Sequence, residues 1–457
     1  MADLAELLAS VVRADQVRSG GDVNEDYGHD ECLTVAAQLP AAVVVPESAA
    51  DVAAVLALAN DHGIPVTARG SGTGLSGACI PRADGIVVSF EKMNQILEID
   101  TENHMAVVQP GVSLDELDEA LRPHGLVYPV FPGEQSASLG GNVNTNAGGM
   151  RAVKYGVTRH HVLGLEAVLA TGEVMRTGGK VVKATTGYDL TQLIIGSEGT
   201  LALVTEVTLK LYPRPEHTAT VLAPFPTLDG VASAVPKIVA SGVGPVILEY
   251  IDLLTMSAIT TSSNLELGIP DDVRDTALAY LVVVMENASD QRLEEDVIAV
   301  SEQVLELGAM DVYVLPPHAG AALIDAREKA FWVAKALGAD DIIDVVVPRA
   351  SVPEYLAMVA ELAAETESWV AGCGHAGDGN VHLSVFQKDP ALRKQVLTKI
   401  FRAGMELGGA ISGEHGVGAA KKSYFLELED PTKIALMKRI KAAFDPNDIL
   451  NPGTLFD

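Results

Sequence analysis

The stretch "ARGSGTGLSGA" (residues 68–78) decides the fold, because it carries four glycines among small hydroxyl side chains. Its last three glycines formally match the GxGxxG pattern of dinucleotide-binding proteins. That pattern must open a helix, whereas Pro81 and the strand-like run 84–90 follow here. We therefore expect a tight turn whose backbone N–H groups bind phosphate oxygens without a Rossmann fold. The alternative for a lone motif of this kind is a flexible surface loop.

Two further polar loops make a binding role more plausible than a flexible surface. The loop "PGEQSASLGGNVNTNAGG" (132–149) holds almost no bulky apolar side chain, and a connection of that length is uncommon unless it has a function. A third, "GSEGT" (196–200), stands just before another strand-like run. Three polar glycine-rich loops in one domain favour a single extended polar ligand.

Around these loops the chain reads as a mixture of strands and helices, an α+β pattern. Residues 41–70 predict a strand, a helix capped by Ser48 and a second strand. The segment "YPRPEHT" (212–218) carries two prolines after the last long strand of this region, which favours a domain boundary. We predict further helices at 113–122, 290–308 and 321–337. We predict a helical segment at 1–40, a first domain at 41–215 and a second at 216–457.

Charge and cysteine usage exclude several classes of protein. The net charge is −29, with 61 acidic against 32 basic residues, which disfavours nucleic acid as a partner. The three cysteines are widely spaced and form no CxxC pair, so neither a disulfide framework nor a thiolate zinc site is indicated. No apolar run of about 18 residues and no secretory signal is present. We expect a soluble, cytoplasmic protein with no transmembrane segment.

Two stretches near the end of the sequence hold candidate metal ligands. In "GHAGDGNVH" (374–382), Asp378-Gly379 favours a two-residue type I′ turn that would place His375 opposite His382. Opposed side chains have Cβ atoms roughly 4.5–5.5 Å apart, close enough for two imidazoles to bind one metal ion. The alternative is a hairpin with two partly exposed histidines that bind no metal.

The second stretch, "SGEHGVG" (412–418), adds a carboxylate and a third imidazole. Glu414 would be the third ligand of a Zn²⁺, Mn²⁺ or Fe²⁺ ion with open positions for a substrate. His415 would point the other way in a β-like stretch and is a candidate base. Its alternative role is to hydrogen-bond a neighbouring ligand.

Taken together, the motifs from about residue 40 to 457 resemble flavoproteins of the vanillyl-alcohol oxidase and p-cresol methylhydroxylase type. The branch is that of D-lactate dehydrogenase, D-2-hydroxyglutarate dehydrogenase and the flavin subunit of glycolate oxidase. The resemblance implies an FAD-binding domain of the p-cresol methylhydroxylase type at 41–215. It also implies an α+β substrate and metal-binding domain at 216–457, with a ferredoxin-like sheet and a C-terminal tail that contacts FAD. Because no histidine lies in the first glycine loop, we expect non-covalent FAD. The implied FAD contacts are Arg69, Gly70, Ser71, Gly72, Thr73, Gly74, Ser76, Pro132, Ser138, Gly141, Asn142, Asn144, Gly148, Glu198, Val204 and Asn451.

The same resemblance implies roles for the candidate active-site residues. His375, His382 and Glu414 match the ligands of one divalent metal, zinc ahead of manganese or iron. His415 matches the residue that takes the proton of the substrate hydroxyl, and Arg327 matches the one that binds its carboxylate. Asn380 completes the candidate catalytic set. The implied reaction is the oxidation of a D-2-hydroxy acid to a 2-keto acid, with hydride passing to flavin N5.

The sequence departs from the 2-hydroxyglutarate enzymes where they bind the second carboxylate. Phe331, Ile342 and Ser384 stand at the positions of their threonine, lysine and asparagine. Because an apolar side chain cannot pair a buried carboxylate, we predict D-lactate or another monocarboxylate as substrate. The alternatives are a glycolate oxidase flavin subunit, a D-2-hydroxyglutarate dehydrogenase, a catalytically silent flavoprotein and a metal-dependent hydrolase.

The sequence leaves the partners of the reaction open. A quinone, a cytochrome, an electron-transfer flavoprotein, oxygen or a partner subunit could each accept the electrons. A homodimer and peripheral attachment to a membrane through a partner both fit the sequence.

Overall fold

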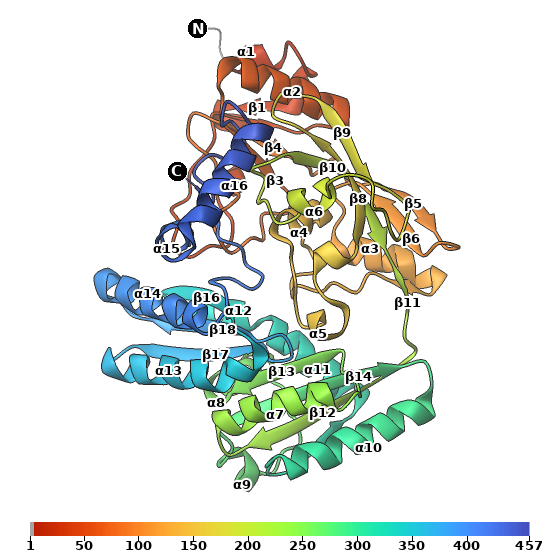
Figure 1. Ribbon diagram of the computed structural model, residues 1–457, viewed down its shortest axis with the longest axis vertical. Helices are drawn as coiled ribbons and strands as arrows, with labels where there is room; N and C mark the ends of the chain where they lie inside the picture. Colours follow the sequence, from red (N-terminus) through yellow and green to blue (C-terminus); the bar gives the residue numbers. More distant parts are fainter. Residues whose placement is uncertain (1–3, 457) are drawn as a thin grey trace.

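The computed structural model describes residues 4–456, which form two lobes joined by extended chain (Figure 1). The first lobe begins with a four-stranded sheet in the order β1-β2-β4-β3. Its strands are β1 (Val17–Ser19), β2 (Ala42–Val44), β4 (Ile86–Ser89) and β3 (Val66–Arg69). The helix predicted after Ser48 is confirmed as α2 (Ala49–His62), because the Ser48 hydroxyl accepts the backbone N–H of Asp51 and Gly63 ends the helix with φ +62°.

The segment before residue 40 is less helical than expected. It holds one short α-helix, α1 (Leu4–Leu8), and the 3-10 turns η1 (Ala14–Gln16), η2 (Gly20–Asp22) and η3 (Glu25–Gly28). Its strand β1 pairs antiparallel with β2, so the segment contributes to the first sheet.

A five-stranded antiparallel sheet, ordered β5-β6-β10-β8-β9, completes the first lobe. Its strands are β5 (Ile96–Asp100), β6 (Met105–Val108), β10 (Leu203–Lys210), β8 (Val162–Val168) and β9 (Val174–Gly178). The connecting elements are α3 (Leu114–Leu121), η4 (Arg122–His124), α4 (Leu139–Thr145), α5 (Ala152–Tyr155), η5 (Thr158–His160) and α6 (Leu190–Ile194). A small pair, β7 (Leu126–Val127) with β11 (Tyr212–Pro213), lies where the chain leaves the lobe.

The second lobe is built on one seven-stranded antiparallel sheet, ordered β15-β12-β14-β13-β17-β18-β16. Its strands are β12 (His217–Phe225), β13 (Ile247–Asp252), β14 (Ala279–Asn287), β15 (Tyr313–Leu315), β16 (Asp341–Val346), β17 (Trp369–His375) and β18 (Asn380–Phe386). One face packs against α7 (Leu228–Ala240), α10 (Asp290–Glu306), α13 (Val352–Glu365) and α14 (Pro390–Glu406). The other face packs against α8 (Leu253–Ser263), α11 (Pro317–Glu328) and α12 (Ala330–Ala336). Two short elements, α9 (Asp271–Arg274) and η6 (Arg349–Ser351), join these parts.

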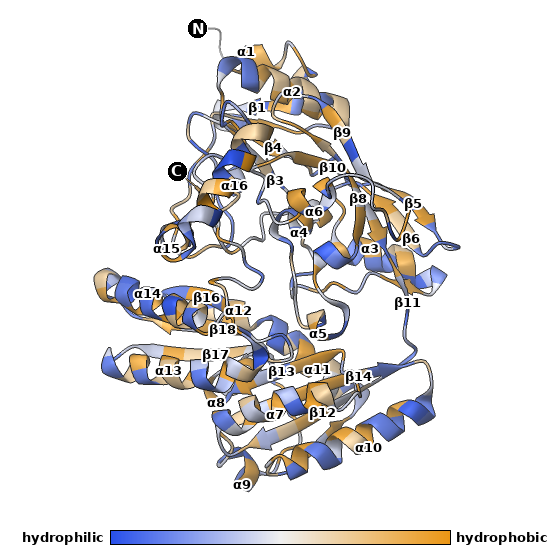
Figure 2. Ribbon diagram, in the orientation of Figure 1, coloured by the Kyte–Doolittle hydropathy of each residue, from blue (hydrophilic) through white to orange (hydrophobic). Residues whose placement is uncertain are grey.

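Hydropathy follows this layering. Figure 2 shows hydrophobic residues concentrated along the strands, while α10, α13 and α14 carry both hydrophobic and hydrophilic residues. Both faces of the large sheet are therefore buried, which is why its strands contain long apolar runs instead of strict alternation.

Two predicted segments differ from the structure. The helix predicted at 321–337 is broken near Lys329, so that α11 and α12 are separate helices. The predicted loop 132–149 contains the helix α4, whose N-cap Ser138 accepts the backbone N–H of Gly141.

The chain returns to the first lobe after α14, through α15 (Lys422–Leu428) and α16 (Pro431–Phe444), drawn in blue beside the red segments of Figure 1. Leu450 forms a parallel bridge with Val66 at the edge of the first sheet. The amide of Asn451 donates to the carbonyls of Ala78 and Glu198. The first lobe is therefore assembled from two separate parts of the sequence.

Candidate functional site

The candidate metal ligands lie on the face of the large sheet that packs against α8, α11 and α12. The predicted register of the hairpin is wrong by two residues: His375 pairs with Asn380, and Cys373 pairs with His382. Residues 376–379 form the turn, and Gly379 has φ +79° whereas Asp378 stays outside the left-handed region, which excludes a type I′ turn. Because the shift is even, both histidines remain on one face, with ring centroids 4.8 Å apart.

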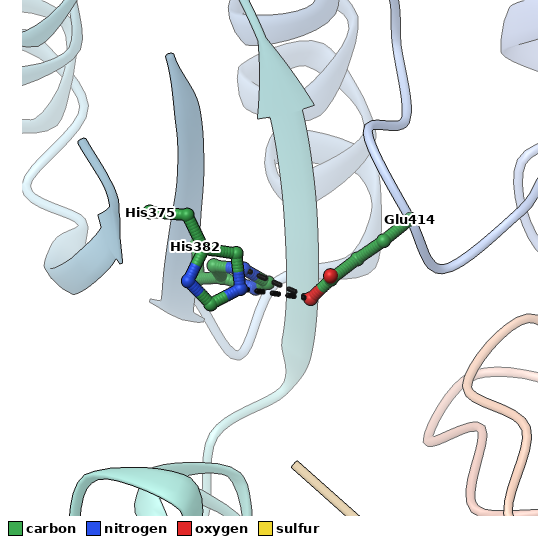
Figure 3. A group of neighbouring side chains, drawn as sticks. All are labelled: His375, His382 and Glu414. Carbon is green, nitrogen blue, oxygen red and sulfur yellow. Dashed lines mark hydrogen bonds and ion pairs between the residues drawn. The ribbon is translucent and has the colours of Figure 1, made fainter. Parts of the chain in front are cut away.

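Glu414 approaches these histidines from residues 412–421, the crossing segment that leads back to the first lobe. Its Oε1 lies 3.3 Å from Nε2 of His375 and 3.2 Å from Nε2 of His382 (Figure 3). One ligand atom from each of the three residues lies within 4.8 Å of the others. Oε2 of Glu414 is buried and has no hydrogen-bond partner among residues 4–456. Two imidazoles and a carboxylate with a spare oxygen fit a divalent ion such as zinc.

Glu249 orients the first of these histidines, and the sequence reasoning missed it. It is fully buried on β13 directly opposite His375. Its Oε1 lies 2.5 Å from Nδ1 of His375, and its Oε2 lies 2.7 Å from a guanidinium nitrogen of Arg327. A carboxylate on Nδ1 turns Nε2 toward the metal position. The available signal was a lone acid in the apolar run "VILEYI" (246–251).

His415 lies on the same cavity as Glu414, so the expectation that it points the other way is wrong. The segment around it is not a strand, and its ring centroid lies 5.1 Å from that of His382. Its Nδ1 lies 3.3 Å from Oδ1 of Asp344, which leaves Nε2 free to accept a proton. Burial lowers the pKa of His415 to about 4, so the imidazole is neutral at pH 7.

Asp344 is the second carboxylate that the sequence reasoning missed. It is fully buried on β16, directly opposite His382. Its oxygens accept the backbone N–H groups of Gly413 and Glu414 at 2.6 and 2.7 Å, and Lys421 donates to it at 2.5 Å. Burial alone would raise the pKa of this carboxyl, but the hydrogen-bonded ammonium of Lys421 outweighs it and holds the pKa well below its usual range. Asp344 therefore anchors the segment that carries Glu414 and His415.

The other two predicted catalytic residues are also brought to the site. Arg327, expected on a helix, is buried at the end of α11, and its Nε has no hydrogen-bond partner among the described residues. Asn380 is buried beside the hairpin turn, and a Cβ on Gly413 would lie 2.6 Å from its side-chain Oδ1. Asn380 thus packs directly beneath the crossing segment.

A cavity of about 260 Å³ contains this cluster at one end. Arg327, His375, His382, Glu414 and His415 line its polar end. Phe331, Ile342 and Ser384, the positions that depart from the 2-hydroxyglutarate enzymes, also line it.

The glycine loops surround two further cavities, of about 180 and 70 Å³. The larger is lined by the predicted contacts Gly70, Ser71, Gly72, Thr73, Gly74, Pro132, Ser138, Gly141, Asn142 and Gly148. The smaller is lined by Arg69, Gly70, Gly141, Asn144, Glu198, Val204 and Asn451. Ser76 lines neither cavity, and its carbonyl accepts the N–H groups of Ala419 and Ala420.

These two cavities share Gly70 and Gly141, so they form one elongated path. A Cβ on Gly70 would lie 1.9 Å from the hydroxyl oxygen of Ser138, which shows how closely the loops approach. The larger cavity meets the metal cluster, since Glu414 and His415 line both. An elongated ligand such as FAD fits this path, with one end beside the candidate catalytic residues.

Two of the predicted FAD contacts, Arg69 and Glu198, hold loops in place with their side chains. Arg69 donates to the carbonyl of His29 at 2.6 Å. The carboxylate of Glu198 accepts the N–H groups of Val417 and Gly418, on the crossing segment. Burial raises the pKa of Glu198, while these two N–H groups lower it.

Comparison with known proteins agrees with these features. The chain is 59% identical over 456 residues to an uncharacterized FAD-linked oxidoreductase of Mycobacterium tuberculosis (strain ATCC 25618 / H37Rv), covering 100% of this chain and 99% of that protein. It is 39% identical to the D-lactate dehydrogenase of Anaerostipes hadrus, covering 96% and 94%. The structure of p-cresol methylhydroxylase with substrate bound superimposes with a TM-score of 0.78 at 18% identity, covering 99% and 96%. That likeness shows the fold, an α+β arrangement of the p-cresol methylhydroxylase type.

Within residues 4–456, no helix combines the length and apolar character needed to cross a membrane. The family model described as an FAD binding domain matches residues 40–178. The model described as the C-terminal domain of FAD linked oxidases matches residues 214–455. Since the two matches together span most of the sequence, the chain is an FAD-linked oxidoreductase and belongs to the FAD linked oxidases.

Proposed function

We propose that this enzyme oxidises a D-2-hydroxy monocarboxylate, D-lactate or a longer apolar homologue, to the 2-keto acid, using FAD and one divalent metal ion. The observation that carries the proposal is that one cavity brings together a His/His/Glu cluster, a buried arginine and a neutral histidine. That cavity meets the glycine-loop path at Glu414 and His415.

Each residue of the cluster has a defined task in this reaction. His375, His382 and Glu414 would hold the metal ion, and the glycine loops would hold FAD. The chemistry that the ion supplies when bound is a lowered pKa of the substrate hydroxyl. The chemistry that FAD supplies when bound is acceptance of the hydride from C2.

The remaining residues orient the substrate and move its proton. Arg327 presents guanidinium N–H groups to the substrate carboxylate, a geometry that a planar fork suits. Nε2 of His415 accepts the hydroxyl proton, because its pKa of about 4 keeps it neutral at pH 7. Asp344 faces Nδ1 of this ring and stabilises the positive charge that the proton brings.

The charge of the cavity supports a monocarboxylate. Arg327 and the three histidines all lie at the polar end of the cavity. A second carboxylate on the substrate would meet the apolar side chains of Phe331 and Ile342 and would find no partner there. An unpaired buried carboxylate costs several kcal/mol. The likeness to a D-lactate dehydrogenase points in the same direction.

The test is an anaerobic titration of the purified holoenzyme that follows the flavin absorbance at about 450 nm. D-lactate should bleach the flavin, L-lactate and D-2-hydroxyglutarate should not, and a chelator should abolish the bleaching until metal is restored. Bleaching by D-2-hydroxyglutarate alone would overturn the substrate assignment. A flavin that none of these acids bleaches would overturn the proposed reaction.

The proposal also requires an acceptor for the electrons that the flavin receives. A quinone, a cytochrome, an electron-transfer flavoprotein or a partner subunit would each complete the cycle. Turnover of the purified chain with an artificial dye distinguishes a self-sufficient enzyme from one subunit of a glycolate oxidase complex.

A further inference from the structure

The substrate cavity extends well beyond the space that D-lactate needs. Its floor is one face of β17 and β18, where successive cross-strand pairs lead away from the metal cluster. These pairs are Cys373 with His382, Ala371 with Ser384, and Trp369 with Phe386, and all six residues line the cavity. Four residues along a strand correspond to about 13 Å. The methyl group of lactate fills only the innermost part of such a floor.

The opposite wall is formed by α8 and α12 and is almost entirely apolar. Leu254, Ile259, Val333 and Leu337 line the cavity from this side, and Ile342 faces them from β16. Small residues stand where larger ones would close the space: Ala258, Ala334 and Ala371. The cavity therefore has the shape of a channel, polar at the metal cluster and apolar along its length.

Large apolar side chains are exposed where the channel opens. Trp369 is 73% exposed, Leu337 65% and Leu254 57%, and all three line the channel. Trp332, 42% exposed, lines the adjoining open cavity together with Leu254 and Leu337. Scattered apolar residues on a surface need no explanation, but a contiguous apolar patch marks a binding site.

The charges of the channel decide what kind of chain it accepts. Of the ionisable side chains that line it, Glu328 stands where the channel adjoins both the glycine-loop cavity and the open outer cavity, and Arg327, Cys373 and the cluster residues stand at the inner end. The floor from Ala371 to Trp369 carries Ser384 and no charged side chain. A chain with a distal carboxylate or ammonium group would lose its hydration there without gaining a partner.

We infer that the outer channel is a binding site for an extended alkyl chain, so that the preferred substrates are D-2-hydroxy fatty acids of medium length. This inference rests on the proposed function, since it assigns the substituent on the carbon that the enzyme oxidises. The carboxylate and hydroxyl lie at the metal cluster, and the alkyl chain runs over Ala371 and Ser384 toward Trp369.

The first test compares kcat/KM of the holoenzyme along the series D-2-hydroxypropanoate, butanoate, hexanoate and octanoate. Each buried methylene is worth about 0.8 kcal/mol, so kcat/KM should rise about fourfold per carbon until the chain reaches the channel mouth. A flat or falling series, with lactate still oxidised, overturns this inference and leaves the proposed function standing. Failure of every acid to bleach the flavin overturns the proposed function itself.

The second test narrows the channel by placing a larger side chain on β17 or on β18. Ala371→Phe and Ser384→Phe should each lower the ratio of kcat/KM for octanoate over that for lactate at least tenfold. Flavin content and thermal midpoint verify that each variant is folded, and two variants on different strands guard against the failure of one. An unchanged ratio in a folded variant contradicts the proposal.

A binding measurement needs no turnover. The chain has two tryptophans, and both stand at the channel mouth or in the cavity beside it. Octanoate, which lacks the reacting hydroxyl, should change the tryptophan fluorescence of the holoenzyme saturably, whereas acetate should not. Trp369→Phe should remove most of the change. Equal responses to octanoate and acetate, or none to either, would refute the alkyl site.

Discussion

Two single carboxylates, Glu249 and Asp344, position the candidate catalytic residues from inside apolar strands. Each is fully buried, and each faces one histidine of the site across the sheet. Buried charges of this kind are tolerated when they are paired on both oxygens, which is the case here. Neither residue stands beside a glycine loop or a histidine in the sequence.

Glu249→Gln should weaken metal binding, because the amide no longer draws the Nδ1 proton of His375 toward itself. Loss of such a partner typically costs about 10–100-fold in metal affinity. The KM for the substrate should rise as well, since Arg327 loses its ion pair. Metal content after dialysis against buffered zinc measures the first effect and initial rates the second. Glu427→Gln, in an exposed pair with Arg402, is the matched control.

Asp344→Asn should lower the free energy of unfolding by about 3–5 kcal/mol, since it leaves the buried ammonium of Lys421 without its counter-ion. Urea titrations at pH 7 measure the change. The control is Asp84→Asn, which is 62% exposed and pairs with an exposed Arg82, and which should cost less than about 1 kcal/mol. Equal effects of the two substitutions would contradict the assigned role of Asp344.

His161 should make the first lobe less stable in acid. It is fully buried, its Nε2 lies 3.0 Å from the carbonyl of Tyr155, and burial lowers its pKa to about 4. Between pH 6.5 and 4 the unfolded chain binds a proton that the folded chain does not, so stability falls as pH falls. The contribution lost at pH 5 is about 2 kcal/mol. In His161→Gln the drop in unfolding free energy from pH 7 to pH 5 should be smaller by that amount. In the exposed control His124→Gln it should be unchanged.

At the scale of elements, the loop that begins at Arg69 and the helix α4 depend on the absence of a side chain at Gly70. In Gly70→Ala the new methyl carbon would lie 1.9 Å from the hydroxyl oxygen of Ser138, so loop and helix must separate. We expect the purified variant to carry much less flavin per chain. The measurement is the ratio of the flavin absorbance at about 450 nm to the protein concentration. Gly21→Ala, where no atom lies within 4 Å of the added carbon, should retain a full complement.

Elements with strong local signals were predictable, and those set by tertiary contacts were not. Ser48 and Gly63 delimit α2 by capping, which is local chemistry. The predicted register of the hairpin after His375 was wrong because the Asp378-Gly379 pair does not form the two-residue turn that such pairs favour. A Cβ on Gly379 would meet the carbonyl of Val347 at 2.0 Å, so contact with the residue that follows β16 fixes the turn.

The candidate site was predictable where its residues share one short motif. Both histidines and Glu414 stand among glycines, and period-two alternation kept the histidines on one face in spite of the wrong register. Glu249 and Asp344 come from strands far away in the sequence. Their pairing partners depend on the strand order β13-β17-β18-β16, which local patterns do not encode.

At the scale of the whole molecule, the two lobes share the segment that carries Glu414. Glu198 of the first lobe accepts N–H groups from this segment, and Asp344 of the second lobe does the same. Any ligand that fixes Glu414 therefore stabilises the contact between the lobes.

Removal of the metal should consequently lower the thermal midpoint of the holoenzyme, and zinc should restore it. A ligand at a hundred times its Kd stabilises the folded state by about 2.7 kcal/mol. Differential scanning fluorimetry with a chelator, followed by excess zinc, magnesium or manganese, measures the effect and ranks the metals. His382→Ala should show no zinc-dependent shift. A shift that survives in this variant would place the metal elsewhere.

The return of the chain to its first sheet also determines when during translation that sheet can be completed. The strand at Val66 leaves the ribosome early, but its neighbour Leu450 and the amide of Asn451 are added almost four hundred residues later. At about 5–20 residues per second, the nascent chain waits tens of seconds before this edge can close. During that interval the glycine loops lack their final support, so we expect flavin to be captured by released chains. Newly made protein should then be most sensitive to proteases when riboflavin is scarce.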